Sequence, residues 1–285
     1  MFYLIQLLNG VQYGLLLFLL ASGLTLIFGI MGVINLAHGS FYMVGAYLAY
    51  WLAKVTGSLW LAIPFGLVIA LAIGLVLETT LVSRLYKRDH LYQVLLTFGL
   101  ILVFEELRSI FFGDNVHGVA VPALLDYSVR LTDTLSYPVY RLFITVVCLA
   151  LAGAMVLVIH KTRIGMMIRA GSSNREMTAS LGVNIRLLFA LVFAFGTALA
   201  AFAGMIAAPI SSVFPGMGNQ ILIICFVVVV IGGIGSINGA MIASLAIGFA
   251  DTLGKVLAPE YSGVAVYLLM AVILLWRPQG LANKT

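Results

Sequence analysis

The sequence predicts an all-α, polytopic membrane protein with eight to nine transmembrane helices, some of them broken or re-entrant. Of its 285 residues, 63% are hydrophobic and only 9% are charged, whereas soluble domains are typically about half apolar and about a quarter charged. Its apolar runs are also long enough for spans, because a transmembrane helix needs about 20 mostly apolar residues. The chain leaves no room for a large soluble domain, so we expect residues 1–285 to form a single transmembrane domain.

Hydropathy places the helices in chain order. The expected spans are 4–30, 33–54, 59–82, 91–112, 141–160, 187–208, 220–234, 237–256 and 263–276. Trp51, Trp60 and Trp276 fall near predicted span ends, where amphipathic rings favour the headgroup region. The stretch 220–256 can be two spans or one broken pair, so the count stays at eight or nine.

Basic residues separate particular spans and predict the orientation. Ten of the 15 lysines and arginines lie in three segments: Arg84, Lys87 and Arg88; Lys161, Arg163, Arg169, Arg175 and Arg186; Arg277 and Lys284. By the positive-inside rule these segments are cytoplasmic. The loop 113–140, with Asp114, Asp126 and Asp133, is then external, as is 209–219. With nine spans the amino terminus lies outside.

The stretch GVINLAHGSFYMVGAY, residues 32–47, is apolar enough for a span yet carries polar side chains. Asn35 and His38 are three residues apart, so on a helix they share one face, where each needs a hydrogen-bond partner. One interpretation is an interhelical polar clamp or a helix cap. The other is that both, with Ser40, line a translocation path or form its hinge. The remaining histidines are scattered without ligand spacing, so no metal site and no cofactor are expected.

A second glycine-rich interruption resembles the first one. Residues 29–37, GIMGVINLA, and 232–240, GGIGSINGA, share the pattern GxxGxINxA. Paired glycine-interrupted segments point to broken helices at a substrate path, which adds Gly235, Ser236 and Asn238 to the candidate path or hinge residues. Chance similarity in a chain rich in these residue types is the alternative. Both segments are expected toward the cytoplasmic face.

Small residues also recur four positions apart within the apolar runs. The pairs are Gly10 and Gly14, Ala200 and Gly204, and Gly235 and Gly239. Because small residues let helix backbones approach closely in a membrane, close packing is the expected role of these pairs.

Charged residues inside the spans are few. Glu105, Glu106 and Arg108 lie in one expected span, and Asp251 and Lys255 lie in another, all toward the external ends. Their spacing of three or four predicts ion pairs within each helix. A proton relay needs acids nearer the middle of the bilayer, which counts against ion-coupled transport. Phosphate-loop, HExxH and GxSxG motifs are missing too, so we expect no enzyme activity in this chain.

The expected cytoplasmic loop 161–186 contains an amphipathic segment. Ser173 and Glu176 form a predicted capping box, Met177 and Leu181 share one face, and Gly182 is placed as a C-cap. These features predict a two-turn helix. It can lie on the membrane surface or on its own protein, or it can dock in a groove of a cytoplasmic partner.

Four stretches together resemble the permease subunits of branched-chain amino-acid ABC transporters, a group that includes urea and amide importers. They are GLTLIFGIMGVINLAHGSFYMVGAY, REMTASLGVN, VVIGGIGSINGAMIAS and WRPQGL, and they cover the chain in order. The resemblance implies a multi-pass subunit of the bacterial inner membrane. It further implies that Glu176, Met177, Ala179, Leu181 and Gly182 belong to a coupling helix.

The resemblance also implies the partners. They are a second, different permease chain, two cytoplasmic ATP-binding subunits, a periplasmic substrate-binding protein and membrane lipid, with no nucleic acid. The expected function is ATP-driven uptake of branched-chain or related amino acids, or of a similar small polar solute, with this chain forming half of the pore. The alternative is a self-sufficient secondary transporter or channel. Transport without any ATPase partner would favour that alternative.

Overall fold

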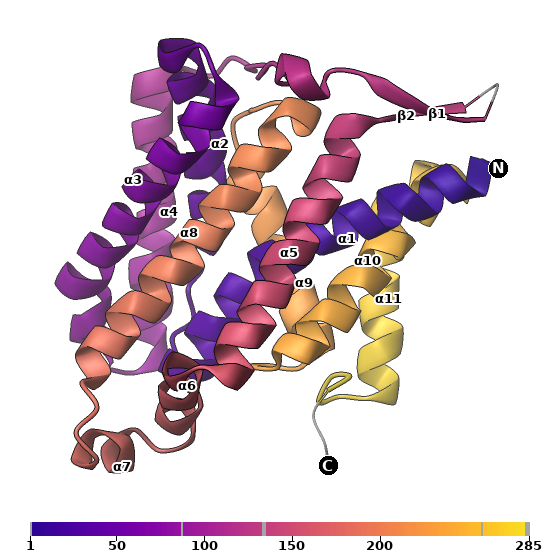
Figure 1. Ribbon diagram of the computed structural model, residues 1–285. Helices are drawn as coiled ribbons and strands as arrows, with labels where there is room; N and C mark the ends of the chain where they lie inside the picture. Colours follow the sequence, from indigo (N-terminus) through magenta and orange to yellow (C-terminus); the bar gives the residue numbers. More distant parts are fainter. Residues whose placement is uncertain (1, 87, 133–134, 258, 283–285) are drawn as a thin grey trace.

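The computed structural model describes residues 2–86, 88–132, 135–257 and 259–282, and this part of the chain is almost entirely helical. Lys87, Asp133 and Lys284, which entered the orientation prediction, lie outside the described residues. Long helices run back and forth through one bundle, with two short strands at one end (Figure 1).

The first half of the bundle contains four long helices. They are α1 (Phe2–Leu26) with a π-helical turn (Ile27–Met31), α2 (His38–Thr56), α3 (Leu59–Thr80) with a 3-10 turn (Val82–Leu85), and α4 (His90–Phe112). A 3-10 turn (Ala123–Leu125) and an antiparallel hairpin of β1 (Ser128–Thr132) and β2 (Leu135–Pro138) follow.

The second half repeats the up-and-down course. It comprises α5 (Val139–Lys161), the short α6 (Arg163–Ser173) and α7 (Arg175–Ser180), then α8 (Ile185–Ser211), α9 (Met217–Gly232), α10 (Ile237–Leu257), a 3-10 turn (Pro259–Tyr261) and α11 (Ser262–Trp276). The long helices match the expected spans in order, and 220–256 forms two helices, α9 and α10. By length and apolarity five described helices qualify as membrane spans, with two shorter apolar helices. These findings establish a helical multi-pass membrane protein, whereas the expected count of eight or nine spans is not confirmed.

The two ends of the bundle differ in charge. The amino terminus, the β1–β2 hairpin and the α8–α9 connection lie at one end, whereas α6, α7, the α9–α10 turn and the last described residues lie at the other (Figure 1). We call these the amino-terminal end and the basic end. The described basic residues at the latter are Arg84, Arg88, Lys161, Arg163, Arg169, Arg175, Arg186 and Arg277. This distribution supports a cytoplasmic basic end, and the orientation stays a prediction.

The core of the bundle lies around α1 and α8. The most apolar stretch of α1 is 89% buried and that of α8 is 78% buried, against 28% for α3 and for α5. Outer helices instead expose large apolar side chains, such as Val68, Leu95, Ile110 and Leu275. Large apolar side chains spread over a whole outer surface fit contact with lipid tails.

Small residues bring the central helices together, as two of the sequence pairs predicted. A Cβ on Gly14 would lie 2.9 Å from the Cα of Leu245 in α10, and one on Gly204 would meet the backbone of Tyr42 in α2. The third pair is different, because Gly235 lies in the turn before α10, with φ at +79°. Gly239 alone packs in the expected way, against Gly232.

The predicted ion pairs are confirmed for four of the five charged residues in the helices. Lys255 Nζ lies 2.6 Å from Asp251 Oδ2, and Arg108 Nε lies 3.3 Å from Glu105 Oε2. Arg108 also donates to Asp114 Oδ1 at 2.8 Å, beyond the end of α4. This hydrogen bond holds the pKa of Asp114 below its usual range.

Candidate functional site

The first interruption separates α1 from α2. Gly32 has a left-handed φ of +62° and ends the π turn, and α2 begins only at His38. Asn35 therefore lies in a non-helical connection and His38 is the first residue of the next helix. The expectation that these two residues share one helix face is wrong, because the left-handed glycine breaks the helix before Asn35.

The polar side chains of this interruption are buried inside the bundle. Asn35 and His38 are 0% exposed and Ser40 is 3% exposed. His38 Nε2 lies 2.9 Å from the carbonyl oxygen of Leu20, so the imidazole joins α2 to α1. Neither amide atom of Asn35 has a hydrogen-bond partner in the described part of the chain, nor does His38 Nδ1. A buried polar atom without a partner costs about 1–3 kcal/mol, so the Asn35 amide destabilises this arrangement of the helices.

The second interruption meets the first one at the basic end. Gly233 and Gly235 both have positive φ, and Ser236 Oγ accepts a hydrogen bond from the Gly239 amide at 3.1 Å, which caps α10. A Cβ on Gly29 would lie only 2.7 Å from the Cα of Gly235. The two GxxGxINxA segments are therefore in direct backbone contact.

A cavity of about 200 Å³ lies beside this contact. Gly235, Ser236 and Asn238 line it together with Thr25 and Gly29 of the α1 segment. Asn35, His38 and Ser40 are not among the lining residues. The structure thus brings the second set of predicted path residues to one cavity and leaves the first set buried between helices.

The loop at the basic end forms two helices, which corrects one prediction. Ser173 is the last residue of α6, and Asn174 caps α7 by accepting a hydrogen bond from the Met177 amide at 2.9 Å. The capping box that starts at Ser173 is therefore wrong, because α6 extends through Ser173 and the break falls one residue later. The C-cap of α7 is Leu181, and Gly182, predicted in that role, follows it with a left-handed φ of +86° and donates its N–H to the Ala179 carbonyl.

The apolar residues predicted for the coupling helix face outward. Met177 is 61% exposed and Leu181 is 76% exposed, whereas Thr178 is buried against the rest of the chain. Glu176 and Ala179 are exposed as well. The α7 segment therefore presents two apolar side chains that no described residue covers.

Arg175, at the start of α7, is a site residue that the sequence analysis missed. Its guanidinium donates to the carbonyl oxygens of Ile30, at 3.3 Å, and Met31, and lies 5.1 Å from the ring centroid of Phe189. The last carbonyls of a helix lack intrahelical partners, and Nη2 of Arg175 donates to two of them. Arg175 thereby ties α7 to the interruption after α1, a long-range contact with no local signal in the sequence.

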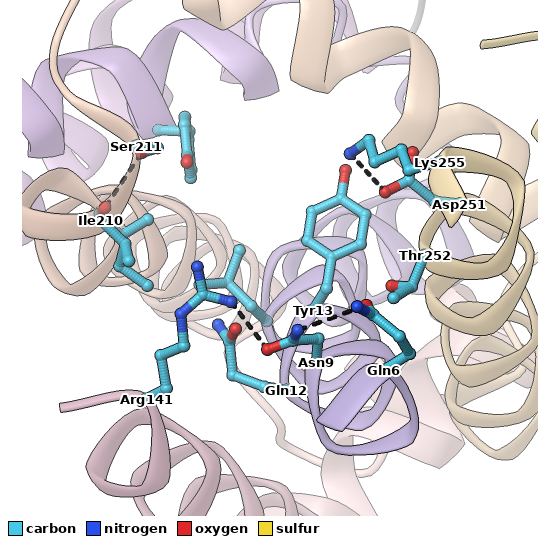
Figure 2. Close-up of a pocket in the computed structure, with 13 residues that line it drawn as sticks. Gln6, Asn9, Gln12, Tyr13, Arg141, Ile210, Ser211, Asp251, Thr252 and Lys255 are labelled. Carbon is cyan, nitrogen blue, oxygen red and sulfur yellow. Dashed lines mark hydrogen bonds and ion pairs between the residues drawn. The ribbon is translucent and has the colours of Figure 1, made fainter. Parts of the chain in front are cut away.

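A larger cavity opens at the amino-terminal end of the bundle. Its volume is about 370 Å³, and α1, α5, α8 and α10 supply most of its walls. Polar side chains from these helices surround the opening, as Figure 2 shows. The sequence predicts only an interfacial ion pair for Asp251 and Lys255, because Arg141 and Asn9, which share the cavity, lie far from them in the chain. Among the described residues no cluster of side chains suited to a metal ion is found.

An apolar helical bundle with two helix interruptions in contact at its basic end, and a polar cavity toward each end, is typical of a membrane transport protein. The chain belongs to the family described as branched-chain amino acid transport system / permease component, whose model matches residues 6–274.

Several curated relatives match nearly the whole chain. One is the high-affinity branched-chain amino acid transport system permease protein LivH of Escherichia coli K12, 31% identical over 299 residues, covering 100% of this chain and 96% of the relative. BraD of Pseudomonas aeruginosa, which bears the same description, is 30% identical over 299 residues, covering 99% and 96%. LivM of Escherichia coli K12 is 29% identical over 290 residues, covering 94% and 68%. No solved structure matches the chain.

Proposed function

We propose that this chain is a permease subunit of an ATP-driven importer for branched-chain or related amino acids in a bacterial inner membrane. Membership of the permease family and the names of the relatives support this function. The chain forms a single transmembrane domain and half of the pore. ATP is hydrolysed by two separate cytoplasmic subunits, and a periplasmic binding protein delivers the solute.

The second permease is a different chain in this proposal. LivH and LivM of one Escherichia coli strain carry the name of the same transport system, and this chain is similar to both. It covers 96% of LivH but 68% of LivM, so it corresponds in length to the former. We therefore place it in the LivH position of a pair.

The α7 segment is the proposed contact with the ATP-binding subunits. Two observations carry this role: Met177 and Leu181 are exposed, and Arg175, two residues before Met177, is hydrogen-bonded to the π-helical turn after α1. A partner that grips the exposed face can move α7, and Arg175 transmits the displacement to Ile30 and Met31. The α7 segment and its ends also include the other proposed coupling residues, Ser173, Glu176, Ala179 and Gly182.

The two interruptions are the proposed hinge of the path. Without side chains at Gly29 and Gly235, the two segments can slide past each other at short range. Ser236 and Asn238 line the cavity beside this contact, and Asn35, His38 and Ser40 form the pivot between α1 and α2. Asn35, whose amide lacks a partner, can gain one when α2 shifts.

Co-purification of the ATP-binding subunits with the permease tests the proposal. Met177→Asp and Leu181→Asp place a charge on the docking face and should release these subunits, whereas Met166→Asp, at an equally exposed position in α6, should retain them. ATP hydrolysis stimulated by the loaded binding protein provides the second readout. Full retention and stimulation in both α7 variants would exclude the coupling role. Solute uptake by the permease alone would instead establish a self-sufficient transporter or channel.

A further inference from the structure

The cavity at the amino-terminal end places a guanidinium on one wall and a carboxylate–ammonium pair on the opposite wall. Arg141 of α5 lies on one side, and the pair of Asp251 and Lys255 of α10 lies on the other, with Tyr13 of α1 between them (Figure 2). The volume of about 370 Å³ falls within the range of roughly 300–1,000 Å³ that is typical of small-molecule sites.

Arg141 is held in place but keeps donors free. Its Nη1 donates to Asn9 Oδ1 at 2.8 Å, and the hydroxyl of Tyr137 donates to the same oxygen at 3.1 Å. A guanidinium has five N–H donors in a planar fork, which matches the geometry of a carboxylate. The arginine is therefore positioned by its neighbours with donors left for an anionic group in the cavity.

Asp251 is the sheltered member of its ion pair. Its side chain is 14% exposed, whereas that of Lys255 is 62% exposed, and their contact uses only Oδ2 of the carboxylate. A lysine on a flexible, solvent-exposed stem contributes little to such a pair. A second ammonium group can therefore replace Lys255 at Asp251 while the lysine moves into solvent.

The remaining lining completes a match to one class of ligand. Leu16, Ala207 and Ile210 supply apolar surface beside the charged walls. We propose that this cavity is a substrate site of the permease itself and binds a zwitterionic α-amino acid with an apolar side chain. Arg141 binds its carboxylate and Asp251 its ammonium group. This site rests on the proposed uptake function and adds a permease-borne recognition step to it.

Direct binding to the full-chain permease complex in nanodiscs, without the binding protein, tests this site. Radiolabelled L-leucine is the probe, and two competitors each lack one of its charged groups. L-leucinol lacks the carboxylate, and 4-methylpentanoate lacks the ammonium group. The wild type should bind leucine saturably and about tenfold or more better than either competitor. Arg141→Gln should lower leucine affinity to that of leucinol, and Asp251→Asn should lower it to that of 4-methylpentanoate.

Matched substitutions control for a general loss of charge or of fold. Arg130→Gln in β1 and Asp126→Asn near the hairpin make the same chemical changes on exposed residues outside the cavity and should bind as the wild type does. Arg141→Lys and Asp251→Glu preserve the charges and should restore part of the affinity. If the Arg141→Gln and Asp251→Asn variants fail to assemble, the leucine affinities of these two charge-preserving variants test the site.

Two results would overturn the site. One is a wild type without saturable leucine binding, as expected for a water-filled vestibule. The other is unchanged affinity and competitor order in the four cavity variants. Amino-acid uptake is measured in proteoliposomes that contain the permease and all its partners, so that failure of the site can be told from failure of the proposed function. If the wild type takes up amino acid and the cavity variants do so equally well, only the site is rejected. Absence of amino-acid uptake by the wild type rejects the function, while the binding series still decides the site.

Discussion

Gly29 and Gly235, from opposite halves of the chain, lie in backbone contact at the basic end of the bundle. A Cβ added to Gly29 would lie 2.7 Å from the Cα of Gly235, closer than real side chains approach. Because the neighbour is backbone and not a flexible side chain, a larger residue must push the two segments apart. This contact lies within the proposed hinge.

Gly29→Ala should therefore reduce uptake and destabilise the protein. Overpacking of a close contact costs about 1–3 kcal/mol, which should lower the thermal unfolding temperature of the purified complex. Gly99→Ala is the matched control, since a Cβ at that helical position meets nothing within 4 Å. The hinge role fails if Gly29→Ala transports as well as Gly99→Ala does.

Arg175→Gln should uncouple ATP hydrolysis from transport without releasing the ATP-binding subunits. The change removes the charge-assisted bonds to Ile30 and Met31, each worth about 1.5–3 kcal/mol, while Met177 and Leu181 stay in place. The ratio of solute transported to ATP hydrolysed is the measurement. Arg163→Gln, in the same loop, is the control, and an equal ratio in both variants would contradict the transmission role.

Capping of α7 gives a prediction that separates two adjacent residues. Asn174→Ala removes the side chain that accepts from the Met177 amide and should destabilise α7 by about 1 kcal/mol, with weaker retention of the ATP-binding subunits. Ser173→Ala should have little effect, because Ser173 ends α6. The measurement is the retention of the ATP-binding subunits by each variant in a graded salt wash. Weaker retention by Ser173→Ala than by Asn174→Ala would place the cap at Ser173.

Asn35 and His38 should respond differently to replacement by leucine. His38→Leu removes the bond to the Leu20 carbonyl and should cost about 1–3 kcal/mol of stability as well as uptake. Asn35→Leu removes an amide without a described partner, so the protein should stay at least as stable yet lose uptake if the residue acts at the pivot. Thermal unfolding and uptake are measured together. Unchanged uptake in both variants would remove these residues from the hinge.

Cysteine labelling tests the orientation of the bundle. Asp126→Cys should react with an impermeant thiol reagent in intact cells, whereas Asp89→Cys should react only after permeabilisation. The native Cys148 and Cys225 are 0% and 1% exposed and should give little background. Labelling of Asp89→Cys in intact cells would invert the topology and remove the cytoplasmic coupling role of α7.

The positions of the long helices could be predicted from the sequence because hydropathy is a property of neighbouring residues. The interruption at Gly32 was predicted, but the second helix was expected from residue 33 and begins only at His38, since hydropathy does not show that residues 33–37 are non-helical. Ser173 and Asn174 are both good N-caps, and the choice between them depends on where α6 ends.

The contacts that define the sites were harder to predict. Arg175 reaches carbonyls of α1, and Arg141 shares a cavity with Asp251, across long stretches of chain. Such contacts depend on how the helices pack, for which a single sequence carries no local signal. The GxxGxINxA repeat was informative because it identified, from the sequence, the two segments that lie in contact in the structure.

The packing of α1 along α10 has a consequence for biogenesis. A Cβ on Gly248 of α10 would lie 2.7 Å from the Cα of Gly14, so each helix fills a notch in the other. Insertion into the bilayer follows the order of synthesis, and α1 is made well before α10. The notched face of α1 is therefore occupied by lipid or by the insertion machinery until α10 arrives. Nascent chains arrested before α10 therefore lack the surface that holds α1 in place.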